Sequence, residues 1–373
     1  MMFEMSLTAK ALFPCWFLPV DGENPSMPLP PWKKVLWVDL GFLGDTVHSI
    51  PAIRAMAKAG VRVDVMTTQV GSELLALVPE VHRTWVVPLK KPSPPPWKSL
   101  GMILEIRREK YDAAVSPVGS DRNLFCTSAC GARERVAHLT GKSSFLARVG
   151  LTRKLPPRDR AQPVFSQRLA ILSDLGWTGG DPGWSWAISA EDRTWAQKIV
   201  PRPSLHLSVN AASTPLNEWL LDDWAITLRG LWEKRPDLHV FASGTGSERE
   251  SARLGDLHAL VQDPRLNILP GRLSVGRLAA LLLSAELHLG LDSGVLHLAM
   301  SLGKPTVSLF RDSVGRPGWA PRGPSHRVLV RPCDCQTTGR VDCEGNRARC
   351  LSGIKPAEVV QAVLEALPSR PGR

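Results

Sequence analysis

The chain has 373 residues, of which 43% are hydrophobic and 22% charged, and these values are typical of a folded globular protein. Its length allows two domains of ordinary size and excludes global disorder. Lys and Arg outnumber Asp and Glu by 46 to 35, which gives a net charge of +11. This surplus favours anionic partners such as phosphorylated sugars or an acidic lipid surface. The basic residues form no polybasic block and no aromatic–basic pattern, so we expect no nucleic-acid partner.

Targeting signals are weak throughout the sequence. No apolar run approaches the roughly 20 residues that a membrane-spanning helix needs. Residues 1–32 are rich in proline and lack the features of a signal peptide, so we expect an irregular N-terminal extension. We therefore expect the protein to be cytoplasmic. In that compartment its seven cysteines are expected to be free thiols or metal ligands rather than disulfides.

The first regular elements are predicted between residues 34 and 53. A short apolar run at 35–40 predicts a buried strand, and Gly41 and Gly44 permit a tight turn after it. Asp45 and Thr46 then stand where a helix is expected to begin. A strand that leads through glycines into a helix N-terminus is typical of doubly wound α/β domains, and it places Asp45 at the carboxyl edge of the sheet.

Alternating strands and helices follow along the chain. Pro51 lies inside the first helical pattern and predicts a kink or an early end of that helix. In the first part, further strands are expected at 61–66, 85–89, 111–116 and within 129–138, and helices at 72–78, 100–110 and 164–175. In the second part, strands are expected at 205–209, 238–242, 266–269, 287–291 and 306–310, and helices at 222–234, 247–261, 274–284, 293–302 and 356–367.

This order predicts an α/β protein with two Rossmann-like, doubly wound domains that face each other across a cleft. Loop-rich sequence between 150 and 203 is the predicted boundary. The expected division is an irregular extension at 1–32, a first domain at 33–190, a linker at 191–203, a second domain at 204–354, and a C-terminal helix and end at 355–373.

A polar turn follows the predicted strand 287–291. Asp292, Ser293 and Gly294 open a helix there, whose free N–H groups and dipole form a seat for an anion. The alternative is a capped helix without a ligand. His297, in the same helix, would donate a hydrogen bond to a phosphate oxygen, or would be a buried core histidine with a satisfied ring.

Two more polar loops are predicted at the same sheet edge. One spans 210–219 and supplies hydroxyls and amides; the other leads through glycines to Glu248. Glu248 either accepts hydrogen bonds from ribose hydroxyls or interacts only with the helix dipole. Together the three loops indicate a pocket for a nucleoside diphosphate. Asp45 would face this pocket from the first domain, as a general base for a hydroxyl or as a helix cap only.

Several of these stretches resemble glycosyltransferase family 9, the bacterial lipopolysaccharide heptosyltransferases. The matching stretches are GFLGDTVHSIPA at 41–52, STPLNEWL at 213–220, DSGVLHLA at 292–299 and GKPTV at 303–307. The resemblance implies a GT-B fold with the acceptor in the first domain and the nucleotide-sugar in the second. It implies an inverting enzyme without metal or cofactor, which moves heptose from ADP-heptose to the lipopolysaccharide inner core. The partner would be a lipid-linked, phosphorylated sugar at the cytoplasmic face of the inner membrane, with peripheral membrane contact.

The resemblance also assigns roles to individual positions. Asp45 matches the catalytic base. The turn toward the acceptor comprises Gly41, Gly44 and Thr46. The donor-binding positions are Ser213, Asn217, Glu248, Leu273 (beside adenine), Asp292, Ser293, Gly294 and His297.

Two positions depart from the family pattern. Asn217 stands where the family usually has a lysine that offsets diphosphate charge, and Ala212 replaces a usual hydroxyl. These departures keep two alternatives open: transfer from another nucleotide-sugar, and a non-catalytic member that binds a glycan or a partner enzyme. An NAD-dependent oxidoreductase is disfavoured, because no strand leads into a G-x-G-x-x-G turn with an acidic ribose ligand after it.

A cysteine cluster lies near the C-terminus. Its members are Cys333, Cys335, Cys343 and Cys350. The first pair is closer in sequence than the C-x₂₋₄-C pair of most structural metal sites. We therefore expect a loop staple or free thiols rather than a metal, with zinc or iron as the alternative.

Overall fold

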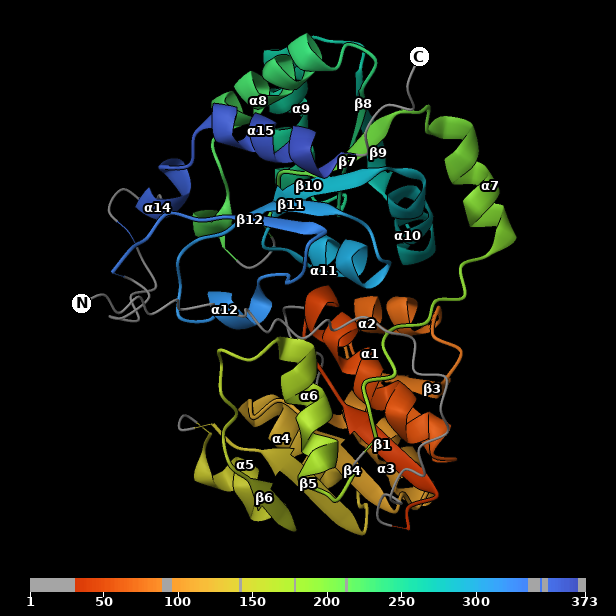
Figure 1. Cartoon of the computed structure of the whole chain (residues 1–373). Helices are drawn as coiled ribbons and strands as arrows, with labels where there is room; N and C mark the ends of the chain where they lie inside the picture. The colour runs from red at the N-terminus through yellow and green to blue at the C-terminus, as the bar shows by residue number, and fades with distance from the viewer. Residues whose placement is uncertain are drawn as a thin grey trace, which may run out of the picture.

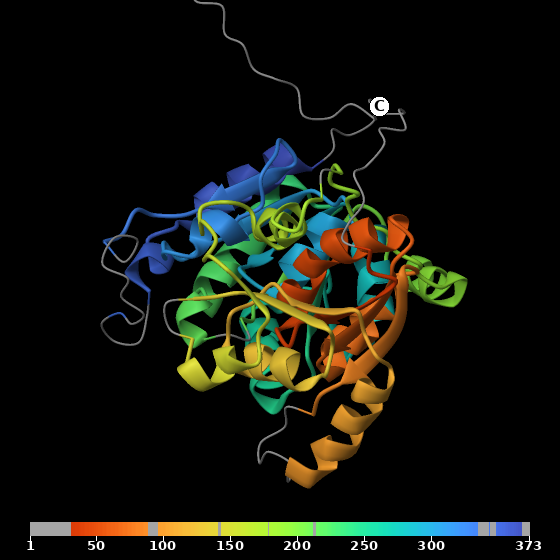
Figure 2. The same ribbon diagram turned by 90° about the horizontal axis from the view of Figure 1, so that it is seen from below.

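The computed structural model describes residues 31–88, 96–140, 143–177, 179–211, 214–334, 343 and 348–367. Two parallel sheets, each with helices packed against it, lie one above the other in Figure 1. We call the elements from β1 to α6 the first half, and those from α7 to α15 the second half. In the view from below, the first half lies nearest the reader (Figure 2).

The first half contains a six-stranded parallel sheet in the order β3-β2-β1-β4-β5-β6. Its strands are β1 (Lys34–Val38), β2 (Arg62–Thr67), β3 (Val81–Val86), β4 (Ala113–Ser116), β5 (Glu134–His138) and β6 (Arg153–Leu155). Its helices are α1 (Leu43–Lys58), α2 (Gln69–Leu75), α3 (Pro96–Arg108), α4 (Asp121–Ala129), α5 (Phe145–Val149) and α6 (Val164–Ser173).

The second half repeats this topology in the order β12-β11-β10-β7-β8-β9. Its strands are β7 (Ser204–Ser208), β8 (His239–Gly244), β9 (Leu266–Arg272), β10 (Leu287–Leu291), β11 (Thr306–Leu309) and β12 (His326–Leu329). Its helices are α7 (Ala190–Ile199), the 3₁₀ turn η1 (Pro215–Asn217), α8 (Leu221–Lys234), α9 (Glu248–Val261), α10 (Val275–Ser284), α11 (Gly294–Ser301), α12 (Arg316–Trp319), α14 (Arg349–Ser352) and α15 (Pro356–Ala366).

Central strands of both sheets are buried on both faces, which explains the continuous apolar run of β1. Strands β7 and β10 are buried along their whole length. The chain order reverses between β1 and β4 in the first sheet and between β7 and β10 in the second. Ligands of doubly wound proteins bind at the carboxyl edge beside such a reversal. The predicted α/β class with two Rossmann-like halves is therefore confirmed.

The early end expected at Pro51 is wrong, because α1 continues to Lys58, and the alternative of a kink stays a prediction. A proline inside a helix has no N–H for the carbonyl four residues earlier, here that of Val47. The indole Nε1 of Trp184 donates a hydrogen bond of 2.9 Å to this carbonyl oxygen. A side chain distant in the sequence thus supplies the donor that Pro51 lacks.

The expected boundaries also differ from the structure at two places. The segment 191–203 is predicted to be a linker, but α7 begins at Ala190, occupies most of this segment and packs against α10. Ser189 caps this helix, and Glu191 and Asp192 favour its first turn. Trp32, expected in the irregular extension, is only 6% exposed and donates to Glu134 at 3.0 Å. The division of the chain into functional domains stays a prediction.

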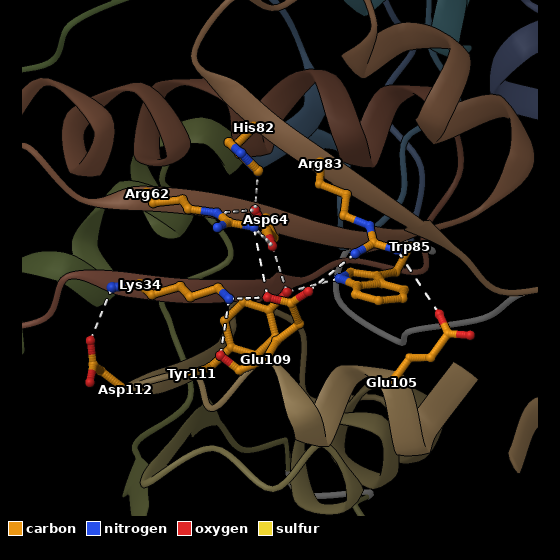
Figure 3. Close-up of polar contacts among 10 residues, drawn as sticks. All are labelled: Lys34, Arg62, Asp64, His82, Arg83, Trp85, Glu105, Glu109, Tyr111 and Asp112. Atoms are coloured by element: carbon orange, nitrogen blue, oxygen red, sulfur yellow. Dashed lines mark hydrogen bonds and ion pairs between the residues drawn. The ribbon is translucent and has the colours of Figure 1, made fainter. Parts of the chain in front are cut away.

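A polar network joins β1, β2, β3 and α3 in the first half (Figure 3). Asp64 is fully buried and accepts a 2.6 Å hydrogen bond from the hydroxyl of Tyr111. Tyr111 in turn accepts a 2.9 Å bond from the indole of Trp85. Around them lie charged partners, namely Lys34, Arg62, His82, Arg83, Glu105, Glu109 and Asp112. Each buried polar atom of Asp64 and Tyr111 thus has a partner, so this network stabilises the fold.

Among the described residues, no helix combines the length and the apolar character that a bilayer-spanning segment needs.

Candidate active site

Asp45 occupies the first turn of α1, directly beyond the carboxyl end of β1. Its Oδ2 accepts a 3.0 Å hydrogen bond from the backbone N–H of Phe42, the residue before the helix. This bond satisfies one of the free N–H groups at the helix start. Gly41 packs so closely that a Cβ atom there would lie 2.3 Å from the Cβ of Asp45. The glycine turn therefore permits the carboxylate to fold back over the chain.

A buried arginine holds the other oxygen of this carboxylate. Nη2 of Arg168, from α6, lies 2.7 Å from Oδ1 of Asp45. Nη1 of the same guanidinium lies 3.5 Å from Oδ2 of Asp39. Asp39 is fully buried and also accepts hydrogen bonds from Ser49 and from the backbone of Gly41. One arginine thus lies between two carboxylates.

The surroundings of Asp45 act on its proton affinity in opposite directions. Burial raises the pKa of Asp45 above its ordinary value, and the neighbouring carboxylate of Asp39 raises this pKa further. The positive charge of Arg168 lowers it. The side chain is still 23% exposed, so a substrate hydroxyl can reach it. A partly exposed carboxylate with a raised pKa is a better general base than an ordinary surface aspartate.

The N-termini of α1 and α11 meet where the two halves touch (Figure 1). A Cβ atom at Gly44 would lie 2.7 Å from Cδ2 of His297, and one at Gly294 would lie 2.7 Å from Cβ of Leu43. Both glycines are therefore required for this close contact. The structure brings together the predicted residues Gly41, Gly44, Asp45, Thr46, Gly294 and His297, with Asp292 and Ser293 adjacent in the same turn.

Two buried histidines join the helices at this contact. Nε2 of His48 on α1 lies 3.1 Å from Nδ1 of His297 on α11. Nε2 of His297 lies 3.5 Å from Oδ1 of Asp292. Burial, with the charges of His297 and Arg168, holds the pKa of His48 well below its usual value, so its ring is neutral at neutral pH. When the ring of His297 is neutral, the tautomers that fit have His48 donating to His297, and His297 donating toward Asp292.

The carboxyl edge of the second sheet carries buried polar atoms without a partner. Neither amide atom of Asn210, which follows β7, has a hydrogen-bond partner among the described residues, and the same holds for Oγ of Ser293 after β10. Asn210 is 6% exposed, and its Nδ2 lies 3.6 Å from where a Cβ of Gly244 would be. Such orphaned groups at a topological reversal fit a polar ligand. Our residue predictions omitted Asn210, although its loop was recognised.

The other predicted donor residues follow neighbouring strands of the same sheet. Glu248 is the first residue of α9 and is exposed, whereas Glu250 is buried and accepts bonds from the backbone and hydroxyl of Thr245. Asn217 ends the turn η1 and is half-buried, and Leu273 after β9 packs against a small apolar cluster. Ser213 and Ala212 lie outside the described residues.

A basic pair stands next to Asn217. Glu218 accepts contacts from Arg249 at 2.9 Å and from Arg253 at 3.5 Å, and it also accepts the N–H of Ala211. The side chain of Arg249 is 49% exposed. Two guanidinium groups therefore lie beside the loop in which the usual lysine is absent. No sequence pattern indicates this pair, because it forms only when α9 packs against the η1 loop.

The cysteine cluster lies beside the loop that follows β11 and beside α14. The backbone N–H of Cys333 donates to Asp312 at 2.8 Å, and the N–H of Asp312 contacts the sulfur of Cys350 at 3.4 Å. Cys333, Cys343 and Cys350 are free thiols, and Cys335 is outside the described residues. In the described part of the chain, no three His, Cys, Asp or Glu residues are grouped so that they could hold a metal.

Comparison with known proteins connects this geometry to an enzyme family. The family model described as glycosyltransferase family 9 (heptosyltransferase) matches residues 102–344. The lipopolysaccharide heptosyltransferase 1 of Pseudomonas aeruginosa is 26% identical over 304 residues, which cover 74% of this chain and 78% of that protein. The lipopolysaccharide core heptosyltransferase OpsX of Haemophilus influenzae is 21% identical over 281 residues, covering 74% and 79%.

Solved structures share the architecture. The ADP-heptose lipopolysaccharide heptosyltransferase II of E. coli superposes with a TM-score of 0.71 at 17% identity, over 89% of this chain and 98% of that one. A family 9 glycosyltransferase from Veillonella parvula gives a TM-score of 0.72 at 20% identity, over 91% and 98%. The fold is therefore GT-B, and the chain belongs to glycosyltransferase family 9.

Proposed function

We propose that this glycosyltransferase is an inverting heptosyltransferase. It would transfer heptose from ADP-heptose to the lipopolysaccharide inner core or a related phosphorylated glycan. The names of the two curated relatives and of the E. coli neighbour support this choice of donor and acceptor.

One observation carries the proposal: Asp45 stands at the contact between α1 and the N-terminus of α11. In the reaction, Asp45 takes the proton of an acceptor hydroxyl while that oxygen bonds to the anomeric carbon. The bond from this carbon to the diphosphate breaks, and the nucleoside diphosphate leaves with the electron pair. The free N–H groups of α11 receive the negative charge that develops on the leaving oxygen. Attack from the face opposite the diphosphate inverts the anomeric configuration.

The remaining donor contacts are proposed from position along the sheet edge. Glu248 would bind the ribose and Leu273 the adenine, while the phosphates lie between the loop with Ser213 and Asn217 and the turn at Asp292–Gly294. Asn210 joins this set, since its unpartnered amide is buried at the same edge. In this scheme residues 33–190 bind the acceptor and 204–354 the donor. The reaction would need no metal, and the enzyme would work in the cytoplasm against the inner membrane.

The test is a transfer assay with ADP-heptose and a heptose-deficient lipopolysaccharide acceptor, in which product is followed by mass spectrometry. We expect transfer by the parent protein. The variant Asp45→Asn should lose about 10²–10⁴-fold in kcat, because acid–base catalysis contributes this much, and it should keep its affinity for ADP. Full activity of the variant would reduce Asp45 to a helix cap.

A second candidate, transfer from another nucleotide-sugar, is favoured by Asn217 in place of the usual lysine. A thermal-shift panel of ADP-, UDP- and GDP-sugars separates the two, since a ligand of the native state raises the melting temperature. A larger shift with a UDP- or GDP-sugar would replace ADP-heptose as the donor. No shift with any of them would favour a non-catalytic member of the family.

A further inference from the structure

Arg168 is the one guanidinium in contact with both Asp39 and Asp45 among the described residues. It is 4% exposed, so its charge is nearly removed from water. Its Nε and Nη1 have no hydrogen-bond partner in the described part of the chain, and only Nη2 makes a well-formed bond, to Asp45. A buried guanidinium with incomplete hydrogen bonding is expensive to maintain for stability alone.

The charge balance at this point is unusual. Asp39 is fully buried, and Asp45 lies at a helix N-terminus close to it. Without a cation between them, two neighbouring carboxylates would not both stay ionised, and one would take up a proton. Asp39 accepts hydrogen bonds from Ser49 and from the Gly41 N–H, whereas burial and the neighbouring Asp39 already raise the pKa of Asp45. The proton would therefore go to Asp45, which would then be unable to act as a base.

We propose that Arg168 is a positioning residue that keeps Asp45 ionised and fixes its Oδ1, so that the carboxylate is ready to accept the proton of the acceptor hydroxyl. This inference rests on the proposed role of Asp45 as the general base. The two oxygens of the Asp45 carboxylate have different partners: the Phe42 N–H donates to Oδ2, and the Arg168 guanidinium donates to Oδ1. These two contacts together fix the plane of the carboxylate.

The charged and titratable groups that face Asp45 come from three elements. They are Arg168 on α6, Asp39 after β1, and His297 on α11. Arg168 and His297 lower the pKa of Asp45, and Asp39 raises it. Removal of Arg168 and removal of Asp39 should therefore shift the activity profile in opposite directions.

The experiment measures kcat/KM for the transfer reaction against pH, with the complete enzyme. Arg168→Met should move the acidic limb to higher pH by about one to three units, the effect expected for loss of an arginine beside an aspartate. Activity should fall at neutral pH and recover in alkaline buffer. Asp39→Asn should move the limb to lower pH. The double variant Arg168→Met/Asp39→Asn restores the single negative charge of the parent cluster, and its limb should lie between those of the two single variants.

Arg54→Met is the matched control. Arg54 is also a buried arginine of the first half, 8% exposed; it lies on α1 nine residues after Asp45 and binds Glu80 at 2.6 Å. Its loss should lower the melting temperature and leave the acidic limb unchanged. An Arg168→Met limb that coincides with the parent limb overturns the proposal, even if kcat is lower. Should that variant not fold, an unshifted limb in Asp39→Asn overturns it instead.

This design separates two failures. If Asp45→Asn is inactive but neither Arg168→Met nor Asp39→Asn moves the limb, Asp45 remains the base and Arg168 is structural. If Asp45→Asn retains full activity, the proposed function of the site is wrong, whatever the profiles of the other variants.

Discussion

His48 and His297 form a buried hydrogen bond of 3.1 Å between the helix that carries Asp45 and the helix that begins at the proposed donor turn. Both rings also pack against Trp319, with centroids 5.3 and 5.1 Å away. This buried contact is one of those that join the two halves at the site.

Replacing His48 should loosen this contact. His48→Phe keeps a ring of similar size but leaves Nδ1 of His297 without a partner, which costs about 1–3 kcal/mol for a buried group. We expect a larger radius of gyration by X-ray scattering in the presence of ADP, and a lower kcat. The double variant with His297→Phe should lose little more than either single one, since both remove the same bond. Parent-like scattering and turnover in His48→Phe would show that the bond does not hold the halves together.

A lysine at position 217 should strengthen donor binding. Bonds to charged groups contribute about 1.5–3 kcal/mol against roughly 0.5–1.5 for neutral ones, so Asn217→Lys should tighten ADP binding by about 1 kcal/mol, near fivefold. Calorimetry at two salt concentrations should show that the added affinity falls as salt rises. Asn217→Gln is the neutral control and should change neither value. An unchanged affinity in Asn217→Lys would mean that residue 217 does not face the diphosphate.

Buried histidines should make the fold sensitive to acid. Burial lowers the pKa of His206 to about 3, while His206 in the unfolded chain titrates near its ordinary value of about 6.5. Between these values the unfolded chain binds a proton that the folded one does not, so stability falls as pH falls below about 6.5. The slope reaches roughly 1.4 kcal/mol per pH unit for one such group. Urea unfolding at several pH values should show a shallower slope in His206→Asn; an equal slope would contradict the assignment.

The network around Asp64 should affect stability and not turnover. Tyr111→Phe removes the bond to Asp64 and leaves the indole of Trp85 without its acceptor. Each orphaned buried group costs about 1–3 kcal/mol, so urea unfolding should show a loss in this range. Glu105→Gln, which breaks the exposed 4.0 Å pair with Arg83, should cost less than about 1 kcal/mol. Reduced kcat in a folded Tyr111→Phe protein would tie the network to the active site.

Elemental analysis of the purified protein should find no stoichiometric zinc or iron. Burial raises the pKa of the Cys350 thiol, with the neighbouring Cys333 and Cys343 acting in the same direction. Metal binding needs thiolates, so a raised pKa opposes it. Thiol titration in denaturant should account for all seven cysteines as free sulfhydryls. One metal ion per chain would instead make this cluster a structural site.

Sequence patterns predicted the long buried elements well, because apolar runs and helical periodicity report directly on burial. They failed where tertiary contacts decide the outcome. Strands β6 and β12 are short and only partly buried, so they lack the apolar run of a central strand. Helix α4 fully buries only Leu124 among its apolar side chains, while Phe125 beside it is exposed, so its sequence shows no helical apolar period.

In the candidate site, too, the residues with a local sequence pattern were predicted and those placed by tertiary contacts were not. The turns at Gly41–Asp45 and Asp292–Gly294 have local signatures, glycines and capping residues, and the sequence located them. Arg168 has none: it is one cation within an otherwise ordinary helix, and its partners are distant in the sequence. Only the packing of α6 against α1 brings it to Asp45. Residues that act through such packing have no signal in a single sequence.

The hydrogen bonds of the segment 184–187 determine where a hinge between the two halves can lie. Trp184 is fastened to α1 at the Val47 carbonyl, and the N–H of Ala187 bonds to the carbonyl of Leu77 in the first half at 2.7 Å. Trp186, between them, donates at 3.2 Å to Ser301 at the end of α11. If the two halves move apart to admit substrate, the bond from Trp186 to Ser301 has to break. The bonds of Trp184 and Ala187 stay, because both acceptors lie within the first half. The hinge then lies after Ala187. Helix α7 moves with the second half as one rigid body, because it packs on α10.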